Sequence, residues 1–235
     1  MPGESGLDPE LCRALSALDS TARPVPEIAP IKDELGNERG FWSTAGLYVT
    51  IGVRHILPAG LDHILFVLAL LLSSATLRAL AWQISAFTVA HTATLGLAAA
   101  GVVAPPAAVV EPLIAASIAF VAVENVAFHR LARWRVHVVF LFGLVHGLGF
   151  AGFLGELGLP PGRFLSGLLG FNVGVEIGQL AVVALAAVLA AGLRHHVPAV
   201  HDDAGWRRLC VVPASLAIAA TGAFWTVERV AAALA

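Results

Sequence analysis

Residues 164–193 read FLSGLLGFNVGVEIGQLAVVALAAVLAAGL, a run of 30 positions in which Glu176 is the one charged side chain. An α-helix rises about 1.5 Å per residue and the hydrocarbon core of a bilayer is about 30 Å thick, so about 20 apolar residues cross it. This stretch is therefore long enough to span a membrane. Asn172, Glu176 and Gln179 are spaced so that they share one face of the helix.

Apolar segments fill most of the remaining chain. They cover residues 42–57, 61–75, 77–100, 107–129, 136–154 and 209–234. Segment 61–75 is marginal in length, and segment 42–57 either crosses the bilayer or lies at its interface. The helix-breaking residues Pro58, Ala59 and Gly60 separate these two segments. The sequence thus predicts an all-α, polytopic membrane helix bundle with six to seven transmembrane helices.

The composition indicates that lipid surrounds most of the chain. Hydrophobic residues make up 58% of the sequence and charged residues only 13%, and half of the sixteen Asp and Glu residues precede Gly40. We therefore divide the chain into a polar N-terminal lead, 1–40, and a transmembrane helical domain, 41–235. No basic block indicates a nucleic-acid partner, and Cys12 and Cys210 lie too far apart to suggest a thiolate metal site.

Arginines in the short loops predict the orientation of the helices. Basic residues alternate between loops along the chain; they are Arg78, then Arg130, Arg133 and Arg135, then Arg194, Arg207 and Arg208. The intervening loops, 99–108 and 155–163, are nearly free of them. The positive-inside rule therefore places the basic loops in the cytoplasm and the C-terminus outside. The N-terminal lead is outside if segment 42–57 is interfacial and inside if that segment spans.

Ionisable side chains within the apolar segments are the candidate functional residues, because each costs about 3 kcal/mol at bilayer depth unless it is paired. The predicted metal ligands are His55, Asp62, His63, His91, Glu124, His146 and Glu176, with Asn125, Asn172 and Gln179 as supporting polar residues. A single buried histidine more often only satisfies hydrogen bonds, but a set of this size predicts a shared site. Imidazole and carboxylate ligands suit nickel, cobalt or zinc, and the scarcity of Cys and Met argues against copper(I).

Closely spaced glycines predict how two of the helices pack. They are Gly143 and Gly147 beside His146, and Gly170, Gly174 and Gly178 beside Glu176. GxxxG faces let backbones approach closely, so we expect these helices to pack together with His146 and Glu176 between them, and an oligomer to be possible through such faces. Asp62 is expected near the outer surface and Glu124 toward the cytoplasm. Polar groups at several depths are typical of a pathway.

Five stretches resemble the HupE/UreJ family of bacterial membrane proteins, in the order that the family has. They are HILPAGLDHILFVLALLL (55–72), SAFTVAHTATLGLA (85–98), VEPLIAASIAFVAVEN (110–125), FGLVHGLGFAG (142–152) and FNVGVEIGQL (171–180). The resemblance implies a multi-pass protein of the bacterial inner membrane, proposed to move nickel or a similar divalent cation; some relatives accompany hydrogenase or urease genes. The better-known nickel permeases have a histidine followed four residues later by Asp-His. Six residues separate His55 from Asp62 here, so the two motifs are not equated.

Three functions use the same ligands. A transporter would capture a hydrated cation at His55, Asp62 and His63, bind it deeper in the bundle, and release it, or take up a proton, at Glu124. The alternative is an enzyme, an intramembrane hydrolase in which zinc activates water. A metal sensor or assembly factor would bind without flux. One compact site with an open coordination position would favour the enzyme, and a ladder of ligands across the membrane would favour the transporter.

Overall fold

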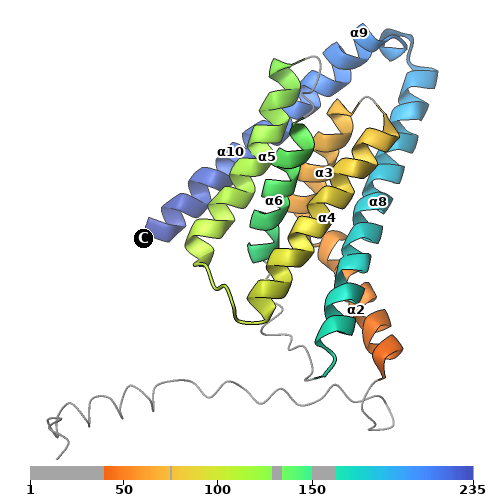
Figure 1. The fold of residues 1–235 in the computed structure, drawn as a ribbon. Coiled ribbons are helices and arrows are strands. Elements are labelled where there is room, and N and C mark those ends of the chain that lie inside the picture. The colour runs from red at the N-terminus through yellow and green to blue at the C-terminus, as the bar shows by residue number, and fades with distance from the viewer. Residues whose placement is uncertain (1–39, 75, 129–133, 150–161, 235) are drawn as a thin grey trace, which may run out of the picture.

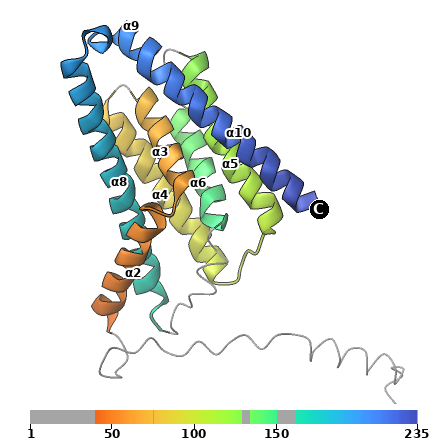
Figure 2. The ribbon, with the colours of Figure 1, turned by 180° about the vertical axis from the view of Figure 1, so that it is seen from behind.

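The structure, a computed structural model, describes residues 40–74, 76–128, 134–149 and 162–234, and every regular element in these ranges is a helix. The elements are α2 (Phe41–Ile56), α3 (Leu61–Ser73), α4 (Leu77–Ala99), α5 (Ala107–Ala127), α6 (Arg135–Gly149), α8 (Phe164–His196), η1 (Pro198–Val200), α9 (Asp203–Trp206), η2 (Arg207–Val211) and α10 (Val212–Leu234). They form one bundle with α3 and α6 in its middle (Figures 1 and 2). The predicted all-α bundle is confirmed.

Several of these helices meet the length and composition expected of a membrane span. Within the described residues they are Ala107–Ala127, Phe164–His196 and the stretch Asp203–Leu234, with the bent pair α2 and α3 as a fourth if it forms one span. The sequence predicts six to seven because it also includes α4 and α6. Helix α4 has 23 residues but a polar face, and α6 is apolar but has only 15 described residues. The end of the predicted segment 136–154 lies outside the described residues.

A broken helix enters the middle of the bundle. Helices α2 and α3 meet at an angle of 73°, across a break that contains Pro58 and Gly60. Pro58 has no N–H to donate, and a Cβ on Gly60 would collide with the carbonyl oxygen of His55. The break therefore places His55, at the end of α2, next to His63, in the first turn of α3. Interrupted helices are tolerated at membrane depth where protein surrounds them.

Glycines bring α8 against α2, and not against α6. A Cβ on Gly174 would overlap the carbonyl oxygen of Val49, and a Cβ on Gly52 would overlap that of Phe171. Helix α6 uses its own glycines against α4, where a Cβ on Gly143 would overlap the carbonyl oxygen of Phe87. The prediction that α6 and α8 pack together is wrong, because each glycine face has a different partner. These faces are filled within the chain, and oligomerisation stays a prediction.

The arginines of the predicted basic loops that the structure describes lie at one end of the bundle. In Figure 1 the start of α4, the start of α6 and the end of α8 lie together at the upper end, and these helix ends carry Arg78, Arg135 and Arg194. The C-terminal end of α10 lies away from them, beside the start of α5 (Figures 1 and 2). Arg78, Arg135 and Arg194 thus lie at one end of the bundle, whereas Arg163 directly precedes α8 and Arg229 lies near the end of α10, toward the other end. The polar lead and the loop with Arg130 and Arg133 lie outside the described residues.

Candidate metal centre

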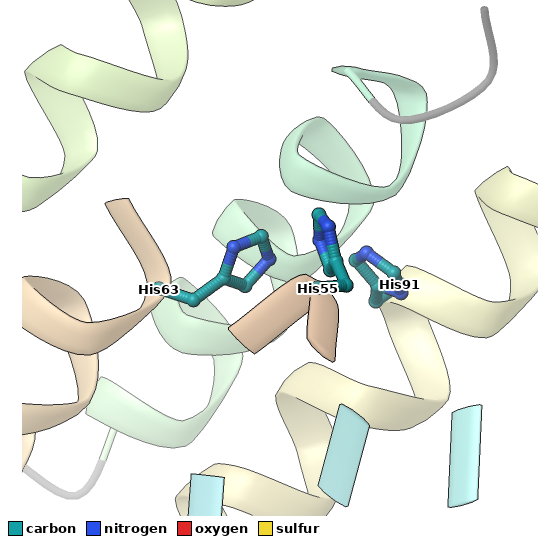
Figure 3. Close-up of side chains that lie close together, drawn as sticks. All are labelled: His55, His63 and His91. Atoms are coloured by element: carbon teal, nitrogen blue, oxygen red, sulfur yellow. The ribbon is translucent and has the colours of Figure 1, made fainter. Parts of the chain in front are cut away.

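Four histidines from four helices meet where α2 breaks from α3; we call them the histidine cluster. They are His55 on α2, His63 on α3, His91 on α4 and His146 on α6. Ligand nitrogens of the first three all lie within 4.8 Å of one another, and Figure 3 shows these three rings side by side. The His146 ring centre is 5.1 Å from that of His63. The imidazoles therefore lie at one level, and not at the several levels predicted.

Glycine packing explains why His91 and His146 meet. A Cβ on Gly147 would collide with the carbonyl oxygen of His91, so the backbones of α4 and α6 approach closely at this point. Aromatic rings then surround the cluster: the centre of Phe66 is 5.1 Å and that of Phe87 is 5.1 Å from the centre of His146. His63, His91 and His146 are buried. Polar contacts in such a buried, aromatic-lined site are expected to be few and specific.

His91 is held in one tautomer by Asn172. The Nδ2 amide of Asn172 donates to the carbonyl oxygen of Leu168 at 2.8 Å, which leaves its Oδ1 to accept. His91 Nδ1 lies 3.2 Å from that oxygen and so carries the proton. The lone pair is then on Nε2, which is buried and has no hydrogen-bond partner among the described residues. A histidine that donates through its other ring nitrogen in this way is typical of a metal ligand.

His146 is held in the opposite tautomer by Ser117. The hydroxyl of Ser117 donates its one proton to the carbonyl oxygen of Ile114 at 2.6 Å. His146 Nε2, at 2.9 Å from Ser117 Oγ, must therefore donate, and its lone pair is on Nδ1. This Nδ1 and the Nε2 of His63 are also buried without a hydrogen-bond partner in the described part of the chain. Three histidines thus present unpaired nitrogens in one small region.

Three of the cluster histidines, His55, His63 and His91, have ligand nitrogens that are nearly the right distance apart for a metal ion. Ligand nitrogens around a tetrahedral Zn²⁺ lie about 3.4 Å from one another, given Zn–N bonds of about 2.1 Å. Small side-chain rotations would bring His55, His63 and His91, now within 4.8 Å, to that spacing. Neutral imidazole binds Zn, Ni, Cu and Fe, whereas carboxylate and carbonyl groups suit Mg and Ca. The donor set therefore fits a borderline-soft divalent cation.

A cavity of about 530 Å³ reaches the histidine cluster. Its lining residues are His55, Ala59, Gly60, Leu61, Asp62, His63, Glu111, Ile114, His146, Gly149, Trp225 and Arg229. Asp62 stands beside His63 in this lining and forms an ion pair with Arg229 at 3.0 Å. The cavity is thus charged where it is lined by Asp62 and Arg229 and carries imidazoles at its inner end. A hydrated ion that enters the cavity therefore passes charged side chains and can reach nitrogen ligands.

The other two predicted carboxylates have partners outside the histidine cluster. Glu176 accepts a hydrogen bond from Ser85 Oγ at 3.4 Å. The predicted pairing of His146 with Glu176 is wrong, because the side-chain partner of His146 is Ser117. Glu124 pairs with Arg135 at 3.4 Å. The predicted role of both carboxylates as metal ligands stays a prediction.

The supporting amides also divide between places. Asn172 orients His91, and Gln179 accepts from Thr88 at 3.4 Å along the same seam between α4 and α8. Asn125 lies instead with Arg135, at 3.3 Å. Sequence reasoning missed Ser117 and Arg229. The sequence does mark Arg229 as a candidate functional residue, because it is a charged side chain within the last apolar segment. A serine in an apolar helix carries no such mark.

Comparison with known families agrees with this geometry. A family model described as HupE / UreJ protein matches residues 32–229, which is most of the chain. The chain belongs to the HupE/UreJ family. The apolar helices and this membership make the HupE/UreJ chain a multi-pass membrane protein, and the membership supports a metal-related role. No curated protein and no solved structure matches the chain.

Proposed function

We propose that this HupE/UreJ protein transports a divalent cation, nickel or cobalt, across the bacterial inner membrane through the histidine cluster. The observation that supports this best is the set of buried ring nitrogens on His63, His91 and His146 that have no hydrogen-bond partner in the described part of the chain, with His63 and His146 also lining the cavity. Buried polar groups without partners are rare, because each one costs free energy unless something binds it. A cation with affinity for neutral imidazole would supply such a partner, and His55, His63 and His91 have ligand atoms close enough together to hold one.

The proposed orientation rests on the arginines of the predicted basic loops. With the arginine-bearing ends of α4, α6 and α8 in the cytoplasm, the cavity faces outside, as does the C-terminus. If α2 and α3 form one broken span, residue 40 at the start of α2 is also outside. Asp62 is then the first of the proposed ligands that an entering cation meets, and Glu176 and Glu124 are proposed to act further along.

The proposal is tested by uptake of radiolabelled nickel, cobalt and zinc into proteoliposomes. His146→Ala is the test variant, and His137→Ala, an exposed histidine on the same helix, is the matched control. We expect uptake of nickel or cobalt by the wild type and by His137→Ala, and loss of most of it in His146→Ala. A wild-type protein that binds the metal but does not move it would overturn transport.

A zinc-dependent hydrolase is the second candidate, because the imidazoles form one compact site and not a ladder. Three histidines and a bound water are a known arrangement for zinc-activated hydrolysis. Such an enzyme also needs a general base near the water, yet Asp62 is held by Arg229 and Glu176 by Ser85. Stoichiometric zinc, no flux, and cleavage of a lipid or peptide probe would favour this function. Binding with neither flux nor cleavage would favour a sensor.

A further inference from the structure

Arg229 contacts the carboxylate that an entering cation would use. From the last part of α10, its Nη2 donates to both oxygens of Asp62, at 3.0 Å each. Its Nη1 donates to the carbonyl oxygen of Glu111 on α5 at 3.1 Å, and its Cζ lies 5.5 Å from the centre of the Trp225 ring. All four residues line the cavity that reaches the histidine cluster. A fixed positive charge therefore stands in the proposed route of a cation.

The ion pair between Arg229 and Asp62 is too accessible to water for its main role to be stabilisation of the fold. The side chains of Arg229 and Asp62 are 22% and 27% exposed, so water competes for both. Ion pairs that water can reach contribute little to stability. The same access allows a dissolved cation to approach Asp62 from the cavity. Both oxygens of Asp62 already accept from Arg229, so a metal ion that binds there competes with the guanidinium for the negative charge and is repelled by its positive charge.

We propose that Arg229 is an internal competitor of the transported cation for Asp62 and so sets the apparent affinity at the cavity. Resting on the proposed function, this inference adds a residue that determines affinity. With no cation, the guanidinium neutralises Asp62 and keeps a bare carboxylate from holding monovalent ions. A divalent cation, with twice the charge, displaces it and passes to His63. Arg229 itself never ligates the metal and acts through Asp62.

The test compares the direction in which the KM of nickel uptake changes in two single variants of the protein. Arg229→Gln removes the competitor, so we expect the KM of nickel uptake to fall about fivefold with little change in Vmax. Asp62→Asn removes the ligand and leaves Arg229 unpaired, so we expect KM to rise at least tenfold. Arg229→Lys keeps the charge and should stay near the wild type. Arg208→Gln, which removes an exposed arginine at the other end of the chain's bundle, is the control for net charge.

If the ion pair between Arg229 and Asp62 only stabilised the fold, the variants would behave differently. Removing either partner would then weaken uptake and lower the thermal stability together, so Arg229→Gln and Asp62→Asn would change KM in the same direction. That result would overturn the proposal. A loss of selectivity for nickel over sodium in Arg229→Gln, with a normal melting temperature, would support it. Equal KM values for Arg229→Gln and Arg208→Gln would also overturn it.

Equilibrium dialysis of the detergent-solubilised protein with nickel separates this inference from the proposed function. If the wild type binds nickel without moving it, transport fails. A tighter Kd in Arg229→Gln and a weaker Kd in Asp62→Asn would still support competition, and two Kd values that shift together would overturn it. If the wild type does not bind nickel, cobalt or zinc, both ideas fail.

Discussion

Two buried polar regions of this protein contrast in how well their groups are paired. Toward the arginine-bearing end, Arg135 is 3% exposed and contacts Glu124 at 3.4 Å and Asn125 Oδ1 at 3.3 Å. Asn125 Nδ2 donates in turn to the carbonyl oxygen of Ala69 on α3 at 2.8 Å and to Ser215 on α10 at 3.3 Å. We call these residues, with Arg207, the arginine network. In the histidine cluster, by contrast, His63, His91 and His146 each have a buried ring nitrogen without a hydrogen-bond partner among the described residues.

The difference separates a structural role from a binding role. In the arginine network, carboxylate, amide and guanidinium groups contact one another across several helices, and Arg207 adds bonds to the carbonyl oxygens of Asn125 and Val126 at 3.0 Å each. Such networks hold helices together, and in this one a single side-chain nitrogen, Arg135 Nε, is buried without a hydrogen-bond partner among the described residues. In the histidine cluster, Asn172 orients His91 and Ser117 orients His146, and the other ring nitrogen of each has no hydrogen-bond partner in the described part of the chain. Changes in the first region should therefore affect stability, and changes in the second should affect binding.

The largest expected effect is a loss of stability in the arginine network. Arg135→Gln leaves the Glu124 carboxylate buried without its charge partner, and removing one partner of a buried ion pair typically costs about 3–5 kcal/mol. Unfolding in mixed detergent, followed by circular dichroism, measures it. The double variant Glu124→Leu with Arg135→Met is the control and should recover much of the loss. An unchanged midpoint in Arg135→Gln would show that this region is not a fastener.

Loss of a central imidazole should affect binding next most strongly. His63→Ala removes a ligand from the middle of the cluster, and we expect nickel affinity to fall about 100-fold, which corresponds to about 2.7 kcal/mol. The unfolding midpoint should stay close to the wild type because an unpaired polar group has been removed. Calorimetric titration with nickel checks the first statement and thermal unfolding the second. A His63→Ala variant with a lower unfolding midpoint and unchanged nickel affinity would show that the histidine cluster stabilises the fold and does not bind the metal.

The orienting residues should have a smaller effect. Ser117→Ala frees the proton-bearing Nε2 of His146, so the tautomer that presents Nδ1 to the cluster is no longer fixed. Removing a residue that orients a metal ligand costs about 10-fold to 100-fold in affinity, and we expect the lower value. Ser85→Ala, on the seam between α4 and α8, is the matched control. Equal affinities in the two variants would contradict the assignment of the tautomer.

The smallest effect is expected at Glu176. Its carboxylate accepts from Ser85 and no contact with the histidine cluster is seen in the described residues. Glu176→Gln keeps an oxygen that can accept this bond, so we expect nickel affinity to change by less than about twofold, or about 0.4 kcal/mol. Nickel titration of Glu176→Gln against the wild type measures this. A tenfold loss would restore the ligand role that the sequence predicts for Glu176.

Patterns that depend on neighbours along the chain were predicted well. The apolar segments match the observed helices closely, Pro58 and Gly60 mark the break, and Asn172, Glu176 and Gln179 do share the face of α8 that meets α4. Helix periodicity and local breakers are enough for these. The pairing of helices was not predicted correctly, because a GxxxG pattern states that a backbone can come close without stating which one. The shared site was predicted, but depth along the membrane was predicted helix by helix, so its groups were expected at several levels and the four imidazoles lie at one.

The sequence by itself thus determined that this is a membrane helix bundle of the HupE/UreJ type with ionisable groups at depth, since hydropathy and residue spacing are properties of the chain. Only the tertiary structure decided which of these groups meet. Gly147 brings α6 against α4, the break after His55 turns α3 into the interior, and Arg229 returns from the far end of the chain to Asp62. Contacts between residues as far as 167 positions apart depend on how helix faces fit, which no local pattern contains.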